Sequence, residues 1–167
     1  MIFVTVGTHE QPFDRLIQQV DALCADGTLT EPVVIQTGVS TYRPEHCRWE
    51  PFFPYTEMDR LMREARIVIT HGGPASFLAV LQLGKVPVVV PRMHSFQEHV
   101  NDHQLLFCRQ VAQRCNNIIL VEDAARLGEI LKNYDALAAQ RSGLLRSNTA
   151  VFNERIQQIA EELVLKK

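Results

Sequence analysis

The segment from His71 to Ser76, His-Gly-Gly-Pro-Ala-Ser, combines residue types that could bind a phosphate group. It follows an apolar run, Ile67–Ile69, and precedes a stretch with helical spacing. Its two glycines would let backbone N–H groups approach a ligand, and its proline suits a first helical turn. The N–H groups near Ala75 and Ser76 would then face an anion at the positive end of the helix dipole. The alternative is a tight turn without a ligand, in which glycine serves only the backbone geometry.

A second segment, Arg92 to Gln104, is rich in histidine and amide side chains. On a helix expected from about Glu98 to Gln113, His99 and His103 are four residues apart and share a face. Side-chain amides in the same segment suit a hydroxyl-rich ligand. A zinc site is the sharper alternative, but the pattern is not HExxH and no third ligand is evident. A solvated polar helix start also stays open.

Two further segments carry chemistry less specifically. His9 and Glu10, in Gly-Thr-His-Glu-Gln after the first apolar run, resemble a general-base pair, although a capped loop explains them equally. The aromatic segment Trp49–Tyr55 could stack a nucleobase or a partner surface, and core or lid packing is the favoured interpretation. Neither GxxxxGK[ST] nor GxGxxG is present, which disfavours an NTPase or a standard dinucleotide enzyme.

The elements that must position these segments alternate along the chain. Strands are expected over 2–7, 32–38, near 48–52, 66–70, 86–91 and 117–122, and helices over 13–24, 57–65, 75–83 and 98–113, with two more near the C-terminus. This alternation predicts an α/β, Rossmann-like, doubly wound parallel sheet. Ligands bind such sheets at the carboxyl ends of the strands, where the four polar loops lie.

Composition limits the class of protein. The 167 residues are 46% hydrophobic and 22% charged, as expected for one globular domain, and the net charge of -2 argues against a nucleic-acid partner. Four cysteines without a CxxC pair suit a reducing cytoplasm. No apolar run approaches the roughly 20 residues of a membrane span, and no signal peptide is evident. We therefore expect a cytoplasmic protein, held at a membrane only through something else.

Three motifs together resemble a known family. "VTVGTHEQPFDRLI", "HGGPASFLAVLQLGKVPVVVPR" and "EHVNDHQ", in this order, are similar to the C-terminal donor-binding half of family-28 (MurG-like) glycosyltransferases. The nearest resemblance is to stand-alone versions of that half: the PssE-type exopolysaccharide subunits and the catalytic subunit of the eukaryotic two-subunit lipid-linked N-acetylglucosamine transferase. It implies a single GT-B half-domain over residues 1–167 that binds a UDP-sugar, ending in an amphipathic helix over 148–165.

The resemblance also implies roles for individual residues. The glycine turn would hold the diphosphate with the Gly7-Thr8 loop near it, and Asp102-His103-Gln104 would reach the sugar hydroxyls. The residues expected to bind the UDP-sugar are Gly7, Thr8, His9, His71, Gly72, Gly73, Ala75, Ser76, Arg92, Glu98, His99, Asp102, His103 and Gln104. No cofactor or metal is expected. Ala79 stands where several relatives carry a ribose-binding glutamate, which puts the donor's identity in doubt.

A full GT-B enzyme needs a second domain of this kind, which binds the acceptor. The resemblance implies a membrane-anchored acceptor-binding subunit, a lipid-linked saccharide acceptor, an inverting transfer in exopolysaccharide or glycolipid assembly, and a peripheral position at the inner face of the membrane. The general base is expected from the partner; the candidates within this chain are His9 and His99. Self-association of the lone chain is plausible. The alternatives are a non-catalytic UDP-sugar-binding regulatory module and an unrelated α/β phosphate-binding protein.

Overall fold

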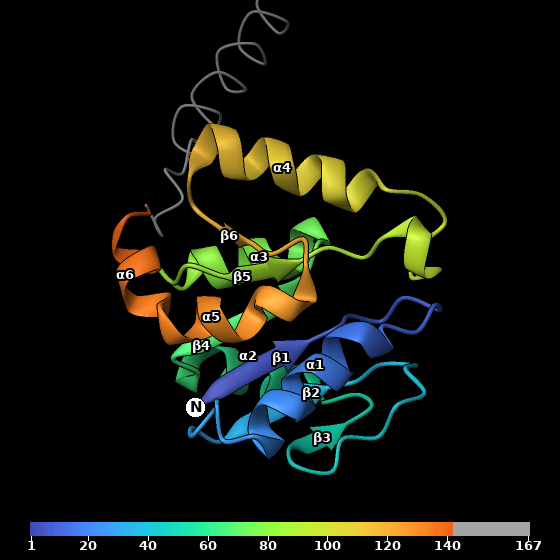
Figure 1. Ribbon diagram of the computed structural model, residues 1–167. Coiled ribbons are helices and arrows are strands. Elements are labelled where there is room, and N and C mark those ends of the chain that lie inside the picture. Colours follow the sequence, from blue (N-terminus) through green and yellow to red (C-terminus); the bar gives the residue numbers. More distant parts are fainter. Residues whose placement is uncertain (142–167) are drawn as a thin grey trace, which may run out of the picture.

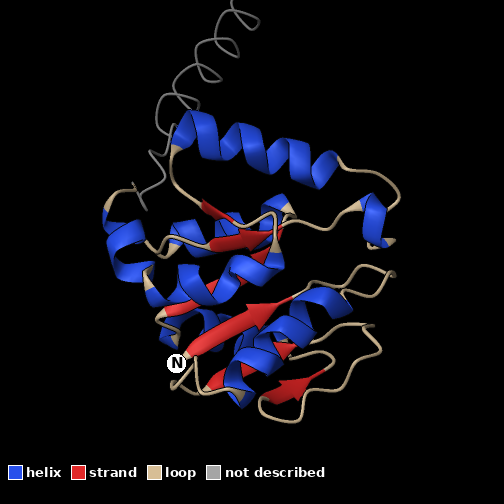
Figure 2. Cartoon of the chain, in the orientation of Figure 1, coloured by secondary structure: helices blue, strands red, loops and turns tan. Residues whose placement is uncertain are grey.

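A six-stranded sheet, all of whose strands are parallel, forms the centre of the molecule (Figures 1 and 2). The structure is a computed structural model and describes residues 1–141. The strands are β1 (Ile2–Thr5), β2 (Val33–Gln36), β3 (Arg48–Glu50), β4 (Ile67–His71), β5 (Val88–Val90) and β6 (Ile119–Leu120), in the order β3-β2-β1-β4-β5-β6. This order confirms the Rossmann-like, doubly wound sheet.

Helices cover both faces of the sheet. They are α1 (Asp14–Ala25), α2 (Tyr55–Glu64), α3 (Pro74–Gln82), α4 (His103–Cys115), α5 (Leu127–Lys132) and α6 (Tyr134–Ala139), with 3-10 turns at His94–Phe96 and Ala124–Arg126. Helices α1 and α5 lie in front of the sheet in Figure 1, and α2 and α3 lie behind it. No helix within residues 1–141 is long and apolar enough to cross a membrane.

The apolar strands are buried because each of their faces packs against helices. In β1, Ile2 and Val4 belong to a core shared with α1, α5 and α6. Phe3, on the opposite face, packs into a second core with residues of α2 and α3. A third cluster joins α3 and α4 over β5. Because helices cover both faces of these strands, the sequences of the strands are continuous runs of β-branched residues.

The position of the site follows from the pairing of β1. This strand pairs with β2 on one side and with β4 on the other, and Thr5 is in register with both Gln36 and Thr70. The loops that follow β1, β2 and β4 therefore begin at one level of the sheet. The chain winds outward in opposite directions from β1 and β4, which leaves the crevice where ligands of such sheets bind.

Two helices begin later than the sequence suggests. Helix α4 begins at His103, not Glu98, because the 3-10 turn ends at Gln97 in the left-handed region (φ 58°) and Glu98 turns back toward Arg15. Helix α1 begins at Asp14, one residue after the expected start at residue 13. The amphipathic helix expected over 148–165 lies outside the described residues.

Candidate active site

The glycine turn places the N-terminus of α3 at the carboxyl end of β4. Gly73 is the N-cap residue with extended backbone angles (φ -72°, ψ 126°), and Pro74 is the first helical residue. No side chain of residues 1–141 caps this helix end. Ala75 is exposed and Ser76 is half-buried. The Ser76 N–H donates to the Gly73 carbonyl (3.1 Å), whereas the Ala75 N–H, which has no partner within residues 1–141, faces the crevice and together with the helix dipole makes a seat for an anion.

Two glycine turns enclose the imidazole of His71. A Cβ built on Gly7 would lie 2.5 Å from His71 Cε1, and one built on Gly73 would lie 2.4 Å from His71 Nε2. Gly7 also has a positive φ of 77°, which favours glycine. Burial and, to a smaller extent, the charge of Arg92 lower the pKa of His71 to about 4, so the ring is neutral at pH 7. Both glycines are needed for the close approach of the two turns.

A cavity of about 350 Å³ opens between these turns and α2. It is lined by Thr5, Gly7, Thr8, Gln36, Phe52, Phe53, Met58, His71, Ala75 and Ser76. Its walls are polar at the glycine turns and apolar at the two phenylalanines. Five of the residues expected from the sequence thus meet in one cavity: Gly7, Thr8, His71, Ala75 and Ser76.

Gln36, at the end of β2, holds the floor of this cavity. Its Oε1 accepts a hydrogen bond from Thr5 Oγ1 (2.6 Å), and its Nε2 donates to the carbonyls of Gly7 (3.0 Å) and Pro51 (3.2 Å). Sequence reasoning missed Gln36, since one polar residue at the end of an apolar strand carries no specific signal. The only hint was its position at the carboxyl edge of the sheet.

The aromatic segment Trp49–Tyr55 divides between core and rim. Trp49 packs against the core beneath α1, and its Nε1 donates to the Pro44 carbonyl (3.0 Å). Phe53 contacts Phe3 edge-on, with ring centroids 6.4 Å apart. Phe52, half-exposed, lies at the cavity, and Tyr55 is largely exposed. Core packing therefore explains Trp49 and the contact of Phe53 with Phe3, and Phe52 and Phe53 line the cavity.

Arg92 is a structural clamp and not a ligand-facing cation. Its side chain is 1% exposed, and its guanidinium donates to the backbone carbonyls of Val6 (2.9 Å), Gln11 (2.7 Å), Pro12 (3.2 Å) and Glu98 (3.2 Å). Burial lowers the pKa of Arg92 to about 10, which leaves it charged at neutral pH. This differs from the expected contact with the donor: Arg92 instead holds the β1–α1 loop beside the loop that follows β5.

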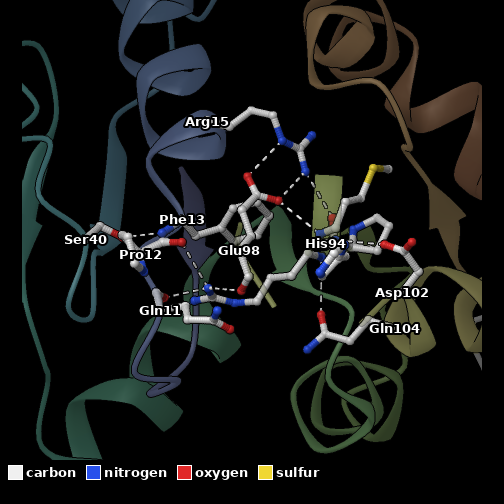
Figure 3. A network of polar contacts seen from close by, with 12 residues as sticks. Gln11, Pro12, Phe13, Arg15, Ser40, His94, Glu98, Asp102 and Gln104 are labelled. Carbon is white, nitrogen blue, oxygen red and sulfur yellow. Dashed lines mark hydrogen bonds and ion pairs between the residues drawn. The ribbon is translucent and has the colours of Figure 1, made fainter. Parts of the chain in front are cut away.

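Glu98 is likewise committed within the protein. Its carboxylate accepts two hydrogen bonds from Arg15, each 2.9 Å long, and a third from the backbone N–H of Met93 (3.1 Å). Figure 3 shows Glu98 facing Arg15, with dashed lines joining them. The carboxylate is buried and its hydrogen-bonding capacity is largely used. Glu98 therefore positions the loop and does not reach toward a sugar, contrary to the expectation from the sequence.

The start of α4 abuts the glycine turn. Gln104 is buried, its Oε1 accepts from the Arg92 backbone N–H (3.2 Å), and a Cβ on Gly72 would lie 3.0 Å from Gln104 Cβ. Asp102 precedes the helix and accepts from the His94 N–H (2.8 Å), a bond drawn in Figure 3. Gly72 is thus required for close packing beneath the seat.

Three histidines from two loops and α4 lie in a row. The ring centroids of His9 and His99 are 4.6 Å apart, and those of His99 and His103 are 4.5 Å apart. The helical face expected for His99 and His103 does not exist, since His99 precedes the helix, but the two rings still meet. Within the described residues no group of three or more histidine, cysteine or acidic side chains is arranged to hold a metal ion.

Comparison with known proteins shows the family of the chain. The glycosyltransferase family 28 C-terminal domain matches residues 1–163. No curated protein sequence matches the chain. A solved structure, the glycosyltransferase SnogD from Streptomyces nogalater, is 17% identical with a TM-score of 0.43; the match covers 85% of this chain and 40% of that one. On the family match, the chain is a glycosyltransferase domain and belongs to the glycosyltransferase family 28 C-terminal domain family.

Proposed function

We propose that this chain is the donor-binding catalytic subunit of a two-component inverting glycosyltransferase. It binds a UDP-sugar, whose sugar is transferred to a lipid-linked acceptor in exopolysaccharide or glycolipid assembly. The acceptor is held by a separate, membrane-anchored subunit, which keeps this chain at the inner face of the membrane. The single observation that carries the proposal is the uncapped N-terminus of α3, which opens into the cavity between the two glycine turns.

The chemistry of transfer suits this helix end. As the bond between the anomeric carbon and the diphosphate breaks, the electron pair and its negative charge pass to the departing diphosphate. The fixed Ala75 N–H and the helix dipole meet that charge without reorganising, which contributes on the order of a few kcal/mol at the transition state. The hydroxyls of Thr8 and Ser76 border the same cavity and suit the ribose, since Ala79 offers it no carboxylate.

The proposal of an acceptor-binding partner draws on exposed apolar side chains. Phe52 and Tyr55 are exposed by 51% and 84% beside the cavity, where a second domain would close over the donor. The attacking hydroxyl and the base that deprotonates it would come with that second domain.

Titration calorimetry tests donor binding directly. We expect UDP and one or more of UDP-N-acetylglucosamine, UDP-glucose, UDP-galactose and UDP-glucuronic acid to bind in EDTA, and Gly73→Ala to weaken binding at least tenfold. The added methyl group would meet His71 Nε2 at 2.4 Å and push the two turns apart.

Gly84→Ala is the matched control at the other end of α3. Gly84 has a positive φ of 73° but nothing within 4 Å of its built Cβ, so the substitution strains the backbone without touching the seat. Its donor affinity should equal that of the unmodified chain. Equal affinities for Gly73→Ala and Gly84→Ala, or no binding by the unmodified chain, would contradict the proposal.

One observation favours a second candidate function. Ala79 removes the ribose-binding carboxylate that several relatives carry, as expected for a regulatory module that binds UDP-sugars without turnover. The Gly73→Ala variant, assembled with the acceptor subunit, separates the two functions. Loss of transfer from an intact complex supports the enzyme, and unchanged transfer supports the module.

A further inference from the structure

The diphosphate seat has no free cation in the loops that surround it. The segments 7–13, 71–76 and 93–102 contain no lysine or arginine. The two arginines that border these segments in the sequence are already committed: Arg92 donates to four backbone carbonyls, and Arg15 pairs with Glu98. Within these segments, the two negative charges of a donor would therefore be met by N–H groups and by side chains that can acquire positive charge.

The row of His9, His99 and His103 is a group of side chains beside the seat that can acquire it: His9 belongs to the loop of Gly7, and His103 precedes Gln104, which packs against Gly72. Neighbouring ring centroids are 4.5 to 4.6 Å apart, so a proton on one ring disfavours a proton on the next. Burial lowers the pKa of His99, and the charges of His103, His9 and Arg92 lower it further. Without a ligand the central ring is therefore neutral at neutral pH.

Hydrogen bonds assign the tautomers of two of these rings. The backbone N–H of Gln11 donates to His9 Nδ1 (3.1 Å), and the backbone N–H of Asn101 donates to His99 Nδ1 (3.4 Å). A backbone N–H can only donate, so each Nδ1 carries a lone pair and each neutral ring carries its hydrogen on Nε2. His9 and His99 thus present N–H donors.

His103 has the opposite tautomer. Asn101 Oδ1 accepts from the His103 backbone N–H (3.1 Å), which identifies that atom as the oxygen of the amide, and it lies 2.5 Å from His103 Nδ1. His103 Nδ1 must then donate, so Nε2 holds the lone pair. Because His103 is exposed, this nitrogen is the one in the row that can take a proton from solvent.

Other charges near the row are few and mostly neutralised. The loop after β1 contributes Glu10, the loop after β5 contributes Glu98 and Asp102, and β4 contributes His71. Glu98 is paired with Arg15, and His71 is neutral. Arg109, on α4, is paired with Glu122. Asp102 accepts a hydrogen bond from the uncharged His94 N–H and keeps its negative charge, and no ion pair joins it to His103 within residues 1–141.

We propose that binding of a nucleotide diphosphate-sugar loads one proton from solvent onto His103 Nε2, so that the histidine row supplies the positive charge that this site otherwise lacks. The added proton makes His103 an imidazolium whose Nδ1–H stays on Asn101. His9 and His99 remain neutral and donate from Nε2. A second proton, on the neighbouring ring of His99, is disfavoured because the two positive charges would repel each other. The inference deepens the proposed function and rests on it.

Calorimetry in buffers of different ionisation enthalpy, such as phosphate and Tris at pH 7, counts the protons taken up. UDP-N-acetylglucosamine and UDP-glucose are suitable probes, because their phosphates are diesters that do not titrate near neutrality, unlike free UDP. We expect between half and one proton per donor bound. By linkage, affinity then falls as the pH rises, by up to about tenfold per pH unit where uptake is complete.

Single substitutions locate the proton. His103→Gln should abolish the uptake and flatten the pH dependence, whereas His9→Gln and His99→Gln should weaken binding and retain the uptake. His46→Gln is the control, because His46 is bound to Asp21 on the other side of α1 and should have no effect. Tight binding without proton uptake overturns the inference and leaves donor binding intact, and so does uptake that survives His103→Gln. Absence of binding overturns both.

A second measurement needs no ligand. Long-range ¹H–¹⁵N correlation spectra of the free protein distinguish Nδ1–H from Nε2–H imidazoles. We expect Nε2–H for His9 and His99 and Nδ1–H for His103, and we expect Asn101→Ala to release His103 to its usual mixture of tautomers. An Nε2–H signal for His103 in the unmodified protein would contradict the assignment.

Discussion

A single buried guanidinium joins the two loops that frame the site. Arg92 follows β5, yet it donates to carbonyls of Val6, Gln11 and Pro12 and lies over the Phe13 ring, 4.8 Å from its centroid. These carbonyls lie at the edge of the core and depend on Arg92 for their hydrogen bonds. Arg92 thus provides the hydrogen bonds that these loop carbonyls would receive from backbone N–H groups in a helix or strand.

Removing this clamp should destabilise the fold substantially. We expect Arg92→Met to lower the free energy of unfolding by about 3 to 5 kcal/mol, because it leaves several buried carbonyls without donors. Arg92→Lys keeps the charge but not the planar fork, so we expect roughly half that loss. Urea unfolding measures both variants.

Arg63→Ala, which removes an exposed ion pair with Asp59, is the control and should cost less than about 0.5 kcal/mol. If Arg92→Lys proves as stable as the unmodified protein, the carbonyls do not depend on the guanidinium.

At the scale of elements, two carboxylates of α1 fasten the β2–β3 connection to that helix. Asp14 accepts from the N–H groups of Thr41 and Tyr42, and Asp21 accepts from the N–H groups of Glu45 and His46 and from the Tyr42 hydroxyl. Burial alone would raise the pKa of Asp21, but these hydrogen bonds outweigh it and lower the pKa to about 2. The connection is therefore ordered by an ionised group.

Ionisation of Asp21 should make the free energy of unfolding depend on pH in the acid range. Because its pKa in the folded protein is below its ordinary value of 3.8, the stabilisation is complete above pH 3.8 and disappears as the pH falls through about 2. The difference corresponds to about 2 kcal/mol. We expect Asp21→Asn to lose at least this much at pH 7 and to flatten the acid limb, measured by urea unfolding from pH 7 to pH 2.

Asp135→Asn is the comparison, since Asp135 is 83% exposed in its pair with Arg66. Its loss should stay below about 0.5 kcal/mol at every pH. If Asp21→Asn leaves the loss of stability at low pH unchanged, another carboxylate causes that loss.

At the scale of the whole molecule, the cavity draws on both halves of the sheet. Its lining comes from β1, β2, the start of α2 and the glycine turn before α3. A ligand held by all of these segments stabilises the folded chain as a unit. We expect UDP at 100 times its dissociation constant to add about 2.7 kcal/mol and to raise the melting temperature by about 5 to 10 °C.

Thermal unfolding with and without UDP measures this effect, and Gly73→Ala should respond by less than about 1 °C at the same concentration. An equal shift in that variant would place the ligand elsewhere in the chain.

Much of this arrangement could be predicted from the sequence because it depends on local patterns. Runs of β-branched residues marked the strands, and Gly-Gly-Pro marked the turn before α3. The role of Arg92 could not be predicted, since backbone carbonyls have no sequence signature and a cation after a strand resembles a ligand contact. The start of α4 was wrong for a related reason: the pair between Arg15 and Glu98, far apart in sequence, removes Glu98 from the helix.

The placement of β1 also matters while the protein is being made. Of the six strands this one is synthesised first, but it lies in the middle of the sheet, and its neighbour β4 begins only at Ile67. Until the later segments are synthesised, one edge of an apolar strand has no partner, one of its faces lacks α3 and the other lacks α5. Parallel strands joined by long crossovers cannot pair early. We therefore expect the nascent chain to pass through a stage with an open strand edge, in which it is prone to aggregation.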